Sequence, residues 1–278
     1  MPRDVFRFIN DLNAETVDRI ATRLEFRATD PGYVAFRDAY FARLPLASAP
    51  RVLALGCGTG VEVRALRQRP EFNGTIVGLD HSPNFIAEAR RLTTREGLDR
   101  DVEYRVGDAH QLDLPDASFD VVLAHTLVSH VTDPLGVLRE ARRVVKPGGV
   151  VAIFDGDYAS LTFSHPDPDL ARRVEETLLE LVVNNPRVMR DMPRLLRDAG
   201  LELSEATPHI YAEIGSGSFF ANFSESYGTI LKGSGLLPED DVERWRTELA
   251  QAVVAGTFFG ASNYYTYLAR RAEAPATI

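Results

Sequence analysis

The sequence predicts an α/β fold of the doubly wound type, in which helices cover both faces of a mostly parallel sheet. Short apolar runs alternate with helical segments between residues 50 and 156. The runs, such as RVLAL at 51–55 and GTIVGLD at 74–80, are apolar throughout instead of alternating with polar residues. Strands of this composition are buried on both faces, which is typical of a parallel sheet flanked by helices.

The order of the elements follows from the local patterns. Helical periodicity separates the apolar runs at 60–69, 83–96 and 133–145. The next runs along the chain are VEYRV, FDVVLAH and GGVVAIFD, and the last of these ends at Asp155. After two amphipathic helices, longer strand-like runs follow at 201–214 and 260–270.

The chain divides into a helical lead-in and one larger α/β domain. Apolar residues recur at helical spacing from Val5 to about Leu44, and Asp30-Pro31-Gly32 interrupts them. We expect residues 1–48 to form an N-terminal lead-in or lid and residues 49–278 to form the main domain. Helical insertions at about 156–187 and 215–257 are expected to form a cap over a ligand-binding site, since insertions of this length are seldom idle loops.

Composition narrows the class of partner. A formal charge of −9 argues against a broad basic face for nucleic acid. The single cysteine, Cys57, excludes an internal disulfide framework, and the sequence shows neither a signal peptide nor a membrane span. We therefore expect a cytoplasmic protein whose partner is a small molecule; the oligomeric state is not predicted.

Three glycines at alternate positions, Gly56, Gly58 and Gly60, lie between the first apolar run and a helical pattern. Glycines here let the backbone turn sharply and let a ligand approach, while the following helix N-terminus favours an anionic group. Val61 and Glu62 follow Gly60, where a P-loop requires Lys and a hydroxyl residue, so that motif is absent. A dinucleotide fingerprint is weakened because its third glycine would fall at position 61.

Four segments carry a resemblance to a known family. They are VLALGCGTG, IVGLDHSP, VGDAHQLDLPDASFDVV and LREARRVVKPGGVVAIFD, within residues 50–156. In this order and spacing they resemble the class I S-adenosylmethionine-dependent methyltransferases, of the small-molecule type that includes the ubiquinone and menaquinone enzymes. The resemblance implies a Rossmann-like sheet of seven strands in the order 3-2-1-4-5-7-6 with strand 7 antiparallel. It also implies S-adenosylmethionine as cofactor and S-adenosylhomocysteine as product.

Candidate cofactor residues come first from the strand ends. Asp80 ends the second strand about 20 residues beyond the glycines, where a carboxylate can accept hydrogen bonds from both ribose hydroxyls. The resemblance implies that Asp108 accepts from the adenine amino group and that the Ala109 N–H meets a ring nitrogen. His81 either stacks on the adenine or is an ordinary exposed loop histidine.

The methionine end of the cofactor is expected at the glycine loop. The resemblance implies that Gly56, Cys57, Gly58 and Gly60 cradle it. Cys57 is expected to be a small packed residue and not a nucleophile, because the sequence gives it no evident activating partner. His125 is expected to shape this end of the pocket. Tyr33 either closes over the methionine or belongs to a packing stripe of the lead-in.

Position 54 departs from the family pattern. Family members commonly carry an acidic residue there, which helps fix the ammonium group of the cofactor, whereas this chain has Ala54. The resemblance therefore implies that another group, such as a strand-four carbonyl or a lead-in residue, holds that charge.

Candidate residues for the acceptor and the chemistry are fewer. His130 is a possible general base, with a turn histidine as the alternative. Asp155 and Asp157 are expected to cap backbone groups or to be solvated; a divalent cation is the alternative, and no metal is predicted. Aromatic residues of the cap are expected to line an acceptor pocket, or else to anchor its helices: Tyr158, Phe219 and Phe223.

The predicted function is methyl transfer from S-adenosylmethionine to a small organic acceptor that is apolar or aromatic, with oxygen and carbon acceptors ahead of nitrogen. Two alternatives stay open. One is a nicotinamide-dependent dehydrogenase. The other is a protein that binds S-adenosylmethionine without transferring its methyl group.

Overall fold

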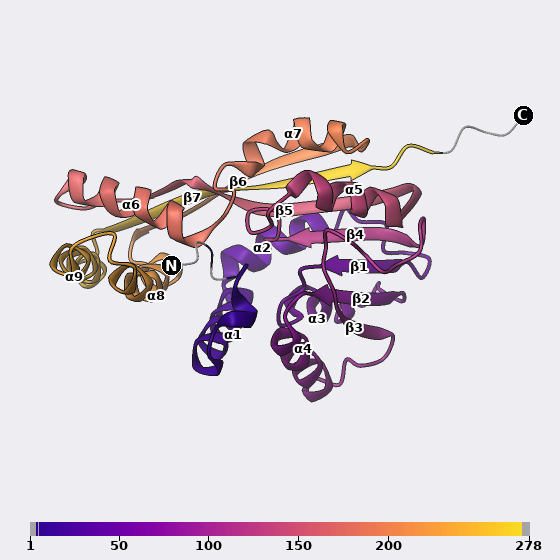
Figure 1. Cartoon of the computed structure of the whole chain (residues 1–278), viewed down its shortest axis with the longest axis horizontal. Helices are drawn as coiled ribbons and strands as arrows, with labels where there is room; N and C mark the ends of the chain where they lie inside the picture. Colours follow the sequence, from indigo (N-terminus) through magenta and orange to yellow (C-terminus); the bar gives the residue numbers. More distant parts are fainter. Residues whose placement is uncertain (1–3, 5, 274–278) are drawn as a thin grey trace, which may run out of the picture.

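The computed structural model describes residue 4 and residues 6–273, and in this part of the chain seven strands form one sheet. The sheet order is β3-β2-β1-β4-β5-β7-β6 (Figure 1). β1 to β5 pair in parallel, and β7 runs antiparallel to both β5 and β6. This confirms the predicted fold class. The strands are β1 (Arg51–Leu55), β2 (Thr75–Asp80), β3 (Val102–Val106), β4 (Phe119–His125), β5 (Val145–Phe163), β6 (Glu202–Gly215) and β7 (Phe258–Arg270).

Several helices begin with the same two-residue signal, an Asp or Ser followed by Pro. The side chains of Asp30, Ser82, Asp133 and Asp167 each accept a hydrogen bond from the backbone N–H three residues later. Proline fits the first helical position because the N–H it lacks would have no partner there. The helices are η1 (Ile9–Asp11), α1 (Ala14–Thr29), α2 (Pro31–Phe41), α3 (Val61–Arg67), α4 (Pro83–Arg95), α5 (Pro134–Val144), α6 (Pro168–Val182), α7 (Val188–Asp198), α8 (Phe219–Ser234) and α9 (Glu239–Ala255).

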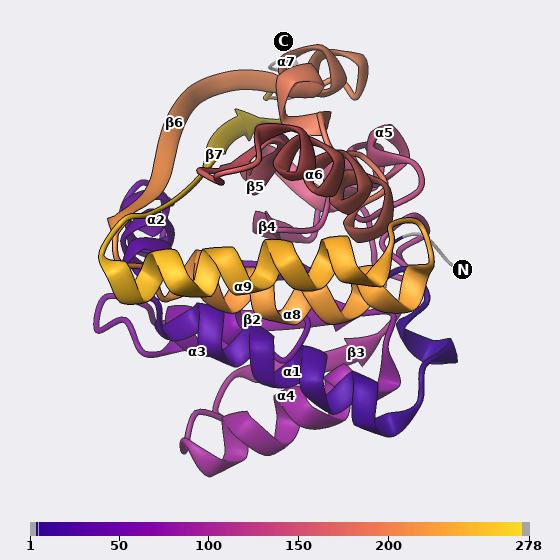
Figure 2. The ribbon, with the colours of Figure 1, turned by 90° about the vertical axis from the view of Figure 1, so that its left-hand side faces the viewer.

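Two apolar cores lie on opposite faces of the sheet. On one face, side chains of α5 and α7 pack over β1, β4 and β5. On the other face, α2, α3 and α4 pack over the same region of the sheet. The second core continues into α6, α8 and α9, which lie at the end of the molecule to which β5, β6 and β7 extend (Figures 1 and 2). The long strands therefore connect the central sheet to a helical layer.

The end of the fifth strand differs from the prediction. β5 continues through Asp155 to Phe163, whereas the sequence predicts its end at Asp155 and a helical insertion from residue 156. The cause is antiparallel pairing with β7, which reaches Phe163 opposite Gly260 after an irregularity between Asp157 and Thr162. Residues 215–257 do contain the two expected helices, α8 and α9. The division into lead-in, main domain and cap stays a prediction.

Candidate functional site

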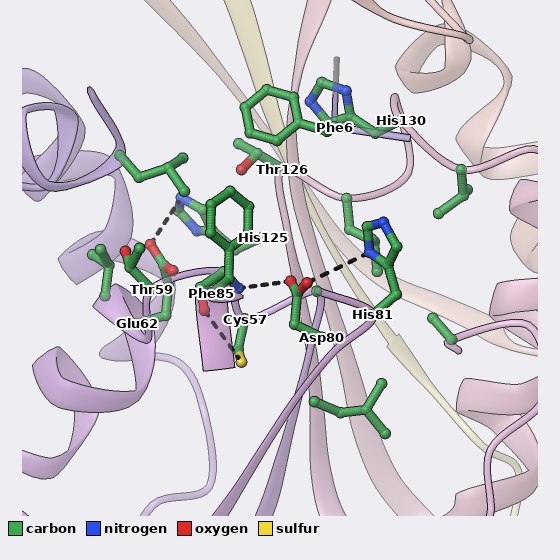
Figure 3. A pocket seen from close by; sticks show the side chains of 18 of the residues that line it. Phe6, Cys57, Thr59, Glu62, Asp80, His81, Phe85, His125, Thr126 and His130 are labelled. Carbon is green, nitrogen blue, oxygen red and sulfur yellow. Dashed lines mark hydrogen bonds and ion pairs between the residues drawn. The ribbon is translucent and has the colours of Figure 1, made fainter. Parts of the chain in front are cut away.

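A cavity of about 350 Å³ lies where β1, β2 and β4 end (Figure 3). Its walls are the loop after β1, the residues that follow β2 and β3, and the turn after β4. The N-terminal segment and α1 close another side, through residues that include Phe6, Arg7, Leu24 and Arg27. The carboxyl ends of strands are the usual ligand sites of open α/β sheets.

The glycine loop forms one wall of the cavity. Gly56 has φ +59°, and a Cβ at this position would lie 2.6 Å from Leu127 Cδ1. A side chain there would therefore both strain the backbone and clash with the turn after β4. Gly56, Cys57 and Gly58 line the cavity, whereas Gly60 is the left-handed N-cap of α3 and does not belong to the wall.

Asp80 ties the ends of β1 and β2 together. Its Oδ2 accepts a hydrogen bond from the Gly58 N–H, and its Oδ1 accepts one from the Ser82 N–H, both at 2.9 Å. The side chain is almost fully buried, so these bonds hold the carboxylate in one orientation. Each carboxylate oxygen can accept more than one hydrogen bond, which leaves Asp80 able to bind a ligand hydroxyl in the cavity.

Asp108 and Ala109, the residues predicted to bind adenine, also line the cavity, together with His110. Asp108 Oδ1 accepts hydrogen bonds from the backbone N–H and ring Nδ1 of His110. Burial raises the pKa of Asp108, but these bonds from His110 outweigh burial and lower the pKa overall. Asp108 is therefore ionised at neutral pH beside the Ala109 backbone. His81 also lines the cavity, and its Nδ1 is 3.4 Å from Asp80 Oδ1 (Figure 3).

At the end of the cavity beside α3, Glu62 and His125 line the wall, and Tyr40 lies behind His125. The Tyr40 hydroxyl lies 2.9 Å from His125 Nδ1, and His125 Nε2 lies 3.3 Å from Glu62 Oε1. Burial, with the charges of Arg27 and Arg37, holds the pKa of His125 well below its ordinary value, so the ring is neutral. A neutral ring carries one proton, so with Tyr40 donating to Nδ1 that proton is on Nε2, the nitrogen nearer Glu62.

Two arginines place positive charge near Glu62. Arg27 Nη2 donates to Thr126 Oγ1 at 2.9 Å, and its guanidinium lies 5.1 Å from the Tyr33 ring centroid. Arg37 lines the same cavity, and among the described residues its buried Nε has no hydrogen-bond partner. Burial raises the pKa of Glu62, and the two arginines offset only part of this effect. This end of the cavity therefore offers one acid and two cations to a ligand.

The turn after β4 positions the other candidate residues. Thr126 has φ +49°, which is strained for a β-branched residue and is a feature of functional sites. His130 lines the cavity, and its Nδ1 is 2.9 Å from Asp4 Oδ2. The buried Asp155 carboxylate accepts from Ser129 N, Ser129 Oγ and Gly156 N, so it fixes this turn to β5.

The comparisons with known proteins agree with this geometry. The family model described as a methyltransferase domain matches residues 53–153. That range contains the glycine loop, Asp80, Asp108 and the turn after β4, within a sheet of the order reported above. The chain belongs to the class I S-adenosylmethionine-dependent methyltransferases.

Individual relatives of this methyltransferase differ in how much of their length matches. An uncharacterised 37.1 kDa protein of a Streptomyces fradiae transposon is 30% identical over 249 residues, covering 89% of this chain and 70% of that protein. The 27-O-demethylrifamycin SV methyltransferase of Amycolatopsis mediterranei (strain S699) is 31% identical over 172 residues, 61% of this chain and 60% of the relative. The crystal structure of a geranyl diphosphate C-methyltransferase from Streptomyces coelicolor A3(2) has a TM-score of 0.55 and 16% identity, over 86% of this chain and 79% of that one.

The structure places the methyltransferase's predicted acceptor residues outside the wall of this cavity. Phe219 and Phe223 are buried in the aromatic core, and Phe219 stacks on Tyr33 with ring centroids 5.3 Å apart. Tyr158 lies beside His130, with ring centroids 6.2 Å apart. Tyr33 itself lines the cavity, so it connects the cavity to this aromatic core.

Sequence reasoning missed the charged residues at the α3 end of the cavity. Glu62 directly follows the glycine loop and Val61, but its sequence position by itself indicates only that the loop is not a P-loop. Arg27 and Arg37 belong to the lead-in helices, where a charge at helical spacing is indistinguishable from a solvated face. The departure at Ala54 was the available signal, because a missing acid implies a substitute nearby.

Two absences concern the described residues only. Residues 4 and 6–273 contain no group of three His, Cys, Asp or Glu side chains arranged to hold a metal ion. Within the same residues, no helix has the length and apolar character needed to cross a bilayer.

Proposed function

We propose that this protein transfers the methyl group of S-adenosylmethionine to a small organic acceptor, with oxygen or carbon as the methylated atom. The observation that carries the proposal is the composition of one cavity wall. A glycine loop, two strand-end carboxylates and a cluster of opposite charges line the same space, at Gly56–Gly58, Asp80, Asp108 and Glu62. These groups match the parts of the cofactor: an amino acid, a ribose and an adenine.

The fit of the cofactor to these residues can be argued group by group. Asp80 would accept from the ribose hydroxyls, because its orientation is already fixed by two backbone N–H groups. Asp108 and the Ala109 N–H would bind the adenine edge. A Cβ at Gly56 would clash with Leu127, so the open backbone of the loop suits close contact with the methionine portion.

Glu62 would take over the role of the acid that is missing at Ala54. An ammonium group needs a carboxylate partner, and Glu62 lines the cavity where the glycine loop enters α3. Arg37, whose buried Nε has no hydrogen-bond partner among the described residues and lies 3.7 Å from Asp38 Oδ1, would meet the carboxylate of the same amino acid together with Arg27. Charge-assisted hydrogen bonds of this kind are about twice as strong as neutral ones.

The cofactor supplies an activated methyl group, so the protein has three tasks. It holds the acceptor in line, excludes water and removes a proton where the acceptor carries one. Alignment alone is worth several orders of magnitude, and a general base contributes about 10²–10⁴-fold. His130 would be the base for a hydroxyl acceptor, since it lines the cavity beside Phe6 and Tyr158.

The acceptor class is supported by the aromatic surroundings. Tyr33 lines the cavity and contacts Phe219, while Tyr158 adjoins His130, so apolar ring surface adjoins the proposed transfer position. With Phe223 these residues would contact an apolar or aromatic acceptor after a rearrangement of the cap. The relative named for 27-O-demethylrifamycin SV is consistent with a small organic acceptor.

A product assay tests the proposal. The protein is incubated with S-adenosylmethionine and a panel of phenolic, polyketide and prenyl acceptors, and S-adenosylhomocysteine is quantified by mass spectrometry. Acceptor-dependent formation of S-adenosylhomocysteine supports the proposal. Tight binding of S-adenosylmethionine without product across the panel would favour a protein that retains the cofactor, and thermal stabilisation by NAD alone would favour a dehydrogenase.

A further inference from the structure

We propose that Asp4 is a positioning residue for His130, and that the N-terminal strap therefore completes the proposed base when it closes the cavity. The N-terminal strap is defined as Asp4 together with residues 6–12. The inference rests on the proposed function, in which His130 is the general base for a hydroxyl acceptor. The structural coupling between Asp4 and His130 is testable by itself.

The buried carboxylate of Asp4 forms hydrogen bonds with groups both near to it and far from it in the chain. It is 0% exposed, its Oδ1 accepts from the Phe6 N–H, and its Oδ2 lies 2.9 Å from His130 Nδ1. Oδ2 also accepts from the Asn184 N–H at 3.2 Å. Because a buried charge is costly without partners, this carboxylate holds the strap against the turn that carries His130.

The same contact decides which ring nitrogen of His130 is available. A carboxylate accepts only, so in the neutral ring the proton lies on Nδ1 and the lone pair on Nε2. Among the described residues, no hydrogen bond involves Nε2 of His130. A general base needs a free lone pair in the site, and the Asp4 contact leaves that lone pair on Nε2.

The strap also covers the cavity. Phe6 and Arg7 line it, and the Phe6 ring lies 4.6 Å from the His130 ring between centroids (Figure 3). Asn10 Nδ2 donates to the His81 carbonyl at 3.0 Å, and Ile9 is fully buried against α1 and α4. The strap thus contacts the loop after β2, at His81, and the turn after β4, at His130. Its closure excludes water and fixes the tautomer of His130 in one event.

The first test reads the tautomer directly. Protein labelled with ¹⁵N-histidine and bound to S-adenosylhomocysteine is studied by long-range ¹H–¹⁵N NMR, with the His130 signals identified by their loss in His130→Phe. We expect a protonated Nδ1 in the wild type and a mixture of tautomers in Asp4→Ala. Asp11→Ala, in the exposed part of the strap, should leave the wild-type tautomer. A wild-type His130 protonated on Nε2, or an Asp4→Ala variant with the wild-type tautomer, overturns the proposal.

A reciprocal test covers the case in which Asp4→Ala does not fold. Hydrogen exchange of the strap amides is compared in His130→Phe and His110→Phe, since His110 lines the cavity but hydrogen-bonds to Asp108, Thr132 and Asp133. Loss of a charge-assisted hydrogen bond should accelerate strap exchange about tenfold or more in His130→Phe and leave it unchanged in His110→Phe. Equal exchange in both variants would contradict the coupling. Absence of methyl transfer would defeat the proposed function while leaving both of these readouts intact.

Discussion

Glu62 Oε1 lies 3.3 Å from His125 Nε2, so the first turn of α3 and the tip of β4 meet at one end of the cavity. His125 is neutral and receives a hydrogen bond from Tyr40, so its proton is on Nε2, the nitrogen nearer Glu62. One neutral donor satisfies only part of the hydrogen-bonding capacity of a carboxylate. Glu62 is therefore oriented by the protein and still able to bind a cation in the cavity.

Replacing Glu62 with Gln should separate two ligands that differ only at their amino acid end. We expect Glu62→Gln to bind S-adenosylhomocysteine about tenfold or more weakly, because a charged hydrogen bond is lost. Its affinity for 5′-methylthioadenosine, which lacks the amino acid, should match that of the wild type. Calorimetric titration checks both values, with the exposed Glu71→Gln as control. Equal weakening for the two ligands would place Glu62 elsewhere than at the ammonium group.

The affinity for S-adenosylhomocysteine should depend on pH through the same residue. Burial raises the pKa of Glu62 above its ordinary value of 4.5, and Arg27 and Arg37 offset part of that rise. The ionised form binds the ammonium group, and it is lost as the pH falls through this raised pKa. Wild-type affinity should therefore begin to fall at a higher pH than an exposed glutamate would produce, while Glu62→Gln shows a flatter profile in titrations from pH 7.5 to 5.

The aromatic core under the cap should be part of the global fold. Trp245 of α9 is fully buried and contacts Phe163 of β5 edge-on, with centroids 5.5 Å apart. We expect Trp245→Ala to lower the free energy of unfolding by about 3–5 kcal/mol, from lost transfer energy and the cavity left behind. Urea unfolding followed by circular dichroism measures this change. Two separate transitions in the wild type would show instead that the cap unfolds independently of the sheet.

The sheet was predictable because its strands and glycine loop are local signals. RVLAL and FDVVLAH are apolar enough to require burial on both faces, and Asp-Pro or Ser-Pro pairs mark the helix starts. The extension of β5 past Asp155 was not predictable in this way. Asp155 and Asp157 resemble a strand end in sequence, yet both side chains are buried. Asp155 accepts a hydrogen bond from the Ser129 N–H, and Asp157 accepts one from Arg190.

The site was predictable only where it follows the strands. Asp80 and Asp108 come directly from strand ends, and the structure places both on the cavity wall. Glu62 and Arg27 are brought there by α3 and by a lead-in helix, and Asp4 precedes η1, the first helix among the described residues. Asp4 and His130 are 126 residues apart in the sequence, so their contact depends on tertiary packing and cannot be predicted from a local pattern.

The most direct test of the whole account is a calorimetric titration of S-adenosylhomocysteine into the wild type, Asp80→Ala and Asp113→Ala, with melting temperatures recorded for each. Asp113 is an exposed residue of the segment between β3 and β4, does not line the cavity, and serves as the matched control. We expect one binding site per chain in the wild type and in Asp113→Ala, and binding at least about tenfold weaker in Asp80→Ala, because two hydroxyl partners lose their acceptor. No binding to the wild type, or full affinity in a folded Asp80→Ala, would contradict the assignment of this cavity to the cofactor.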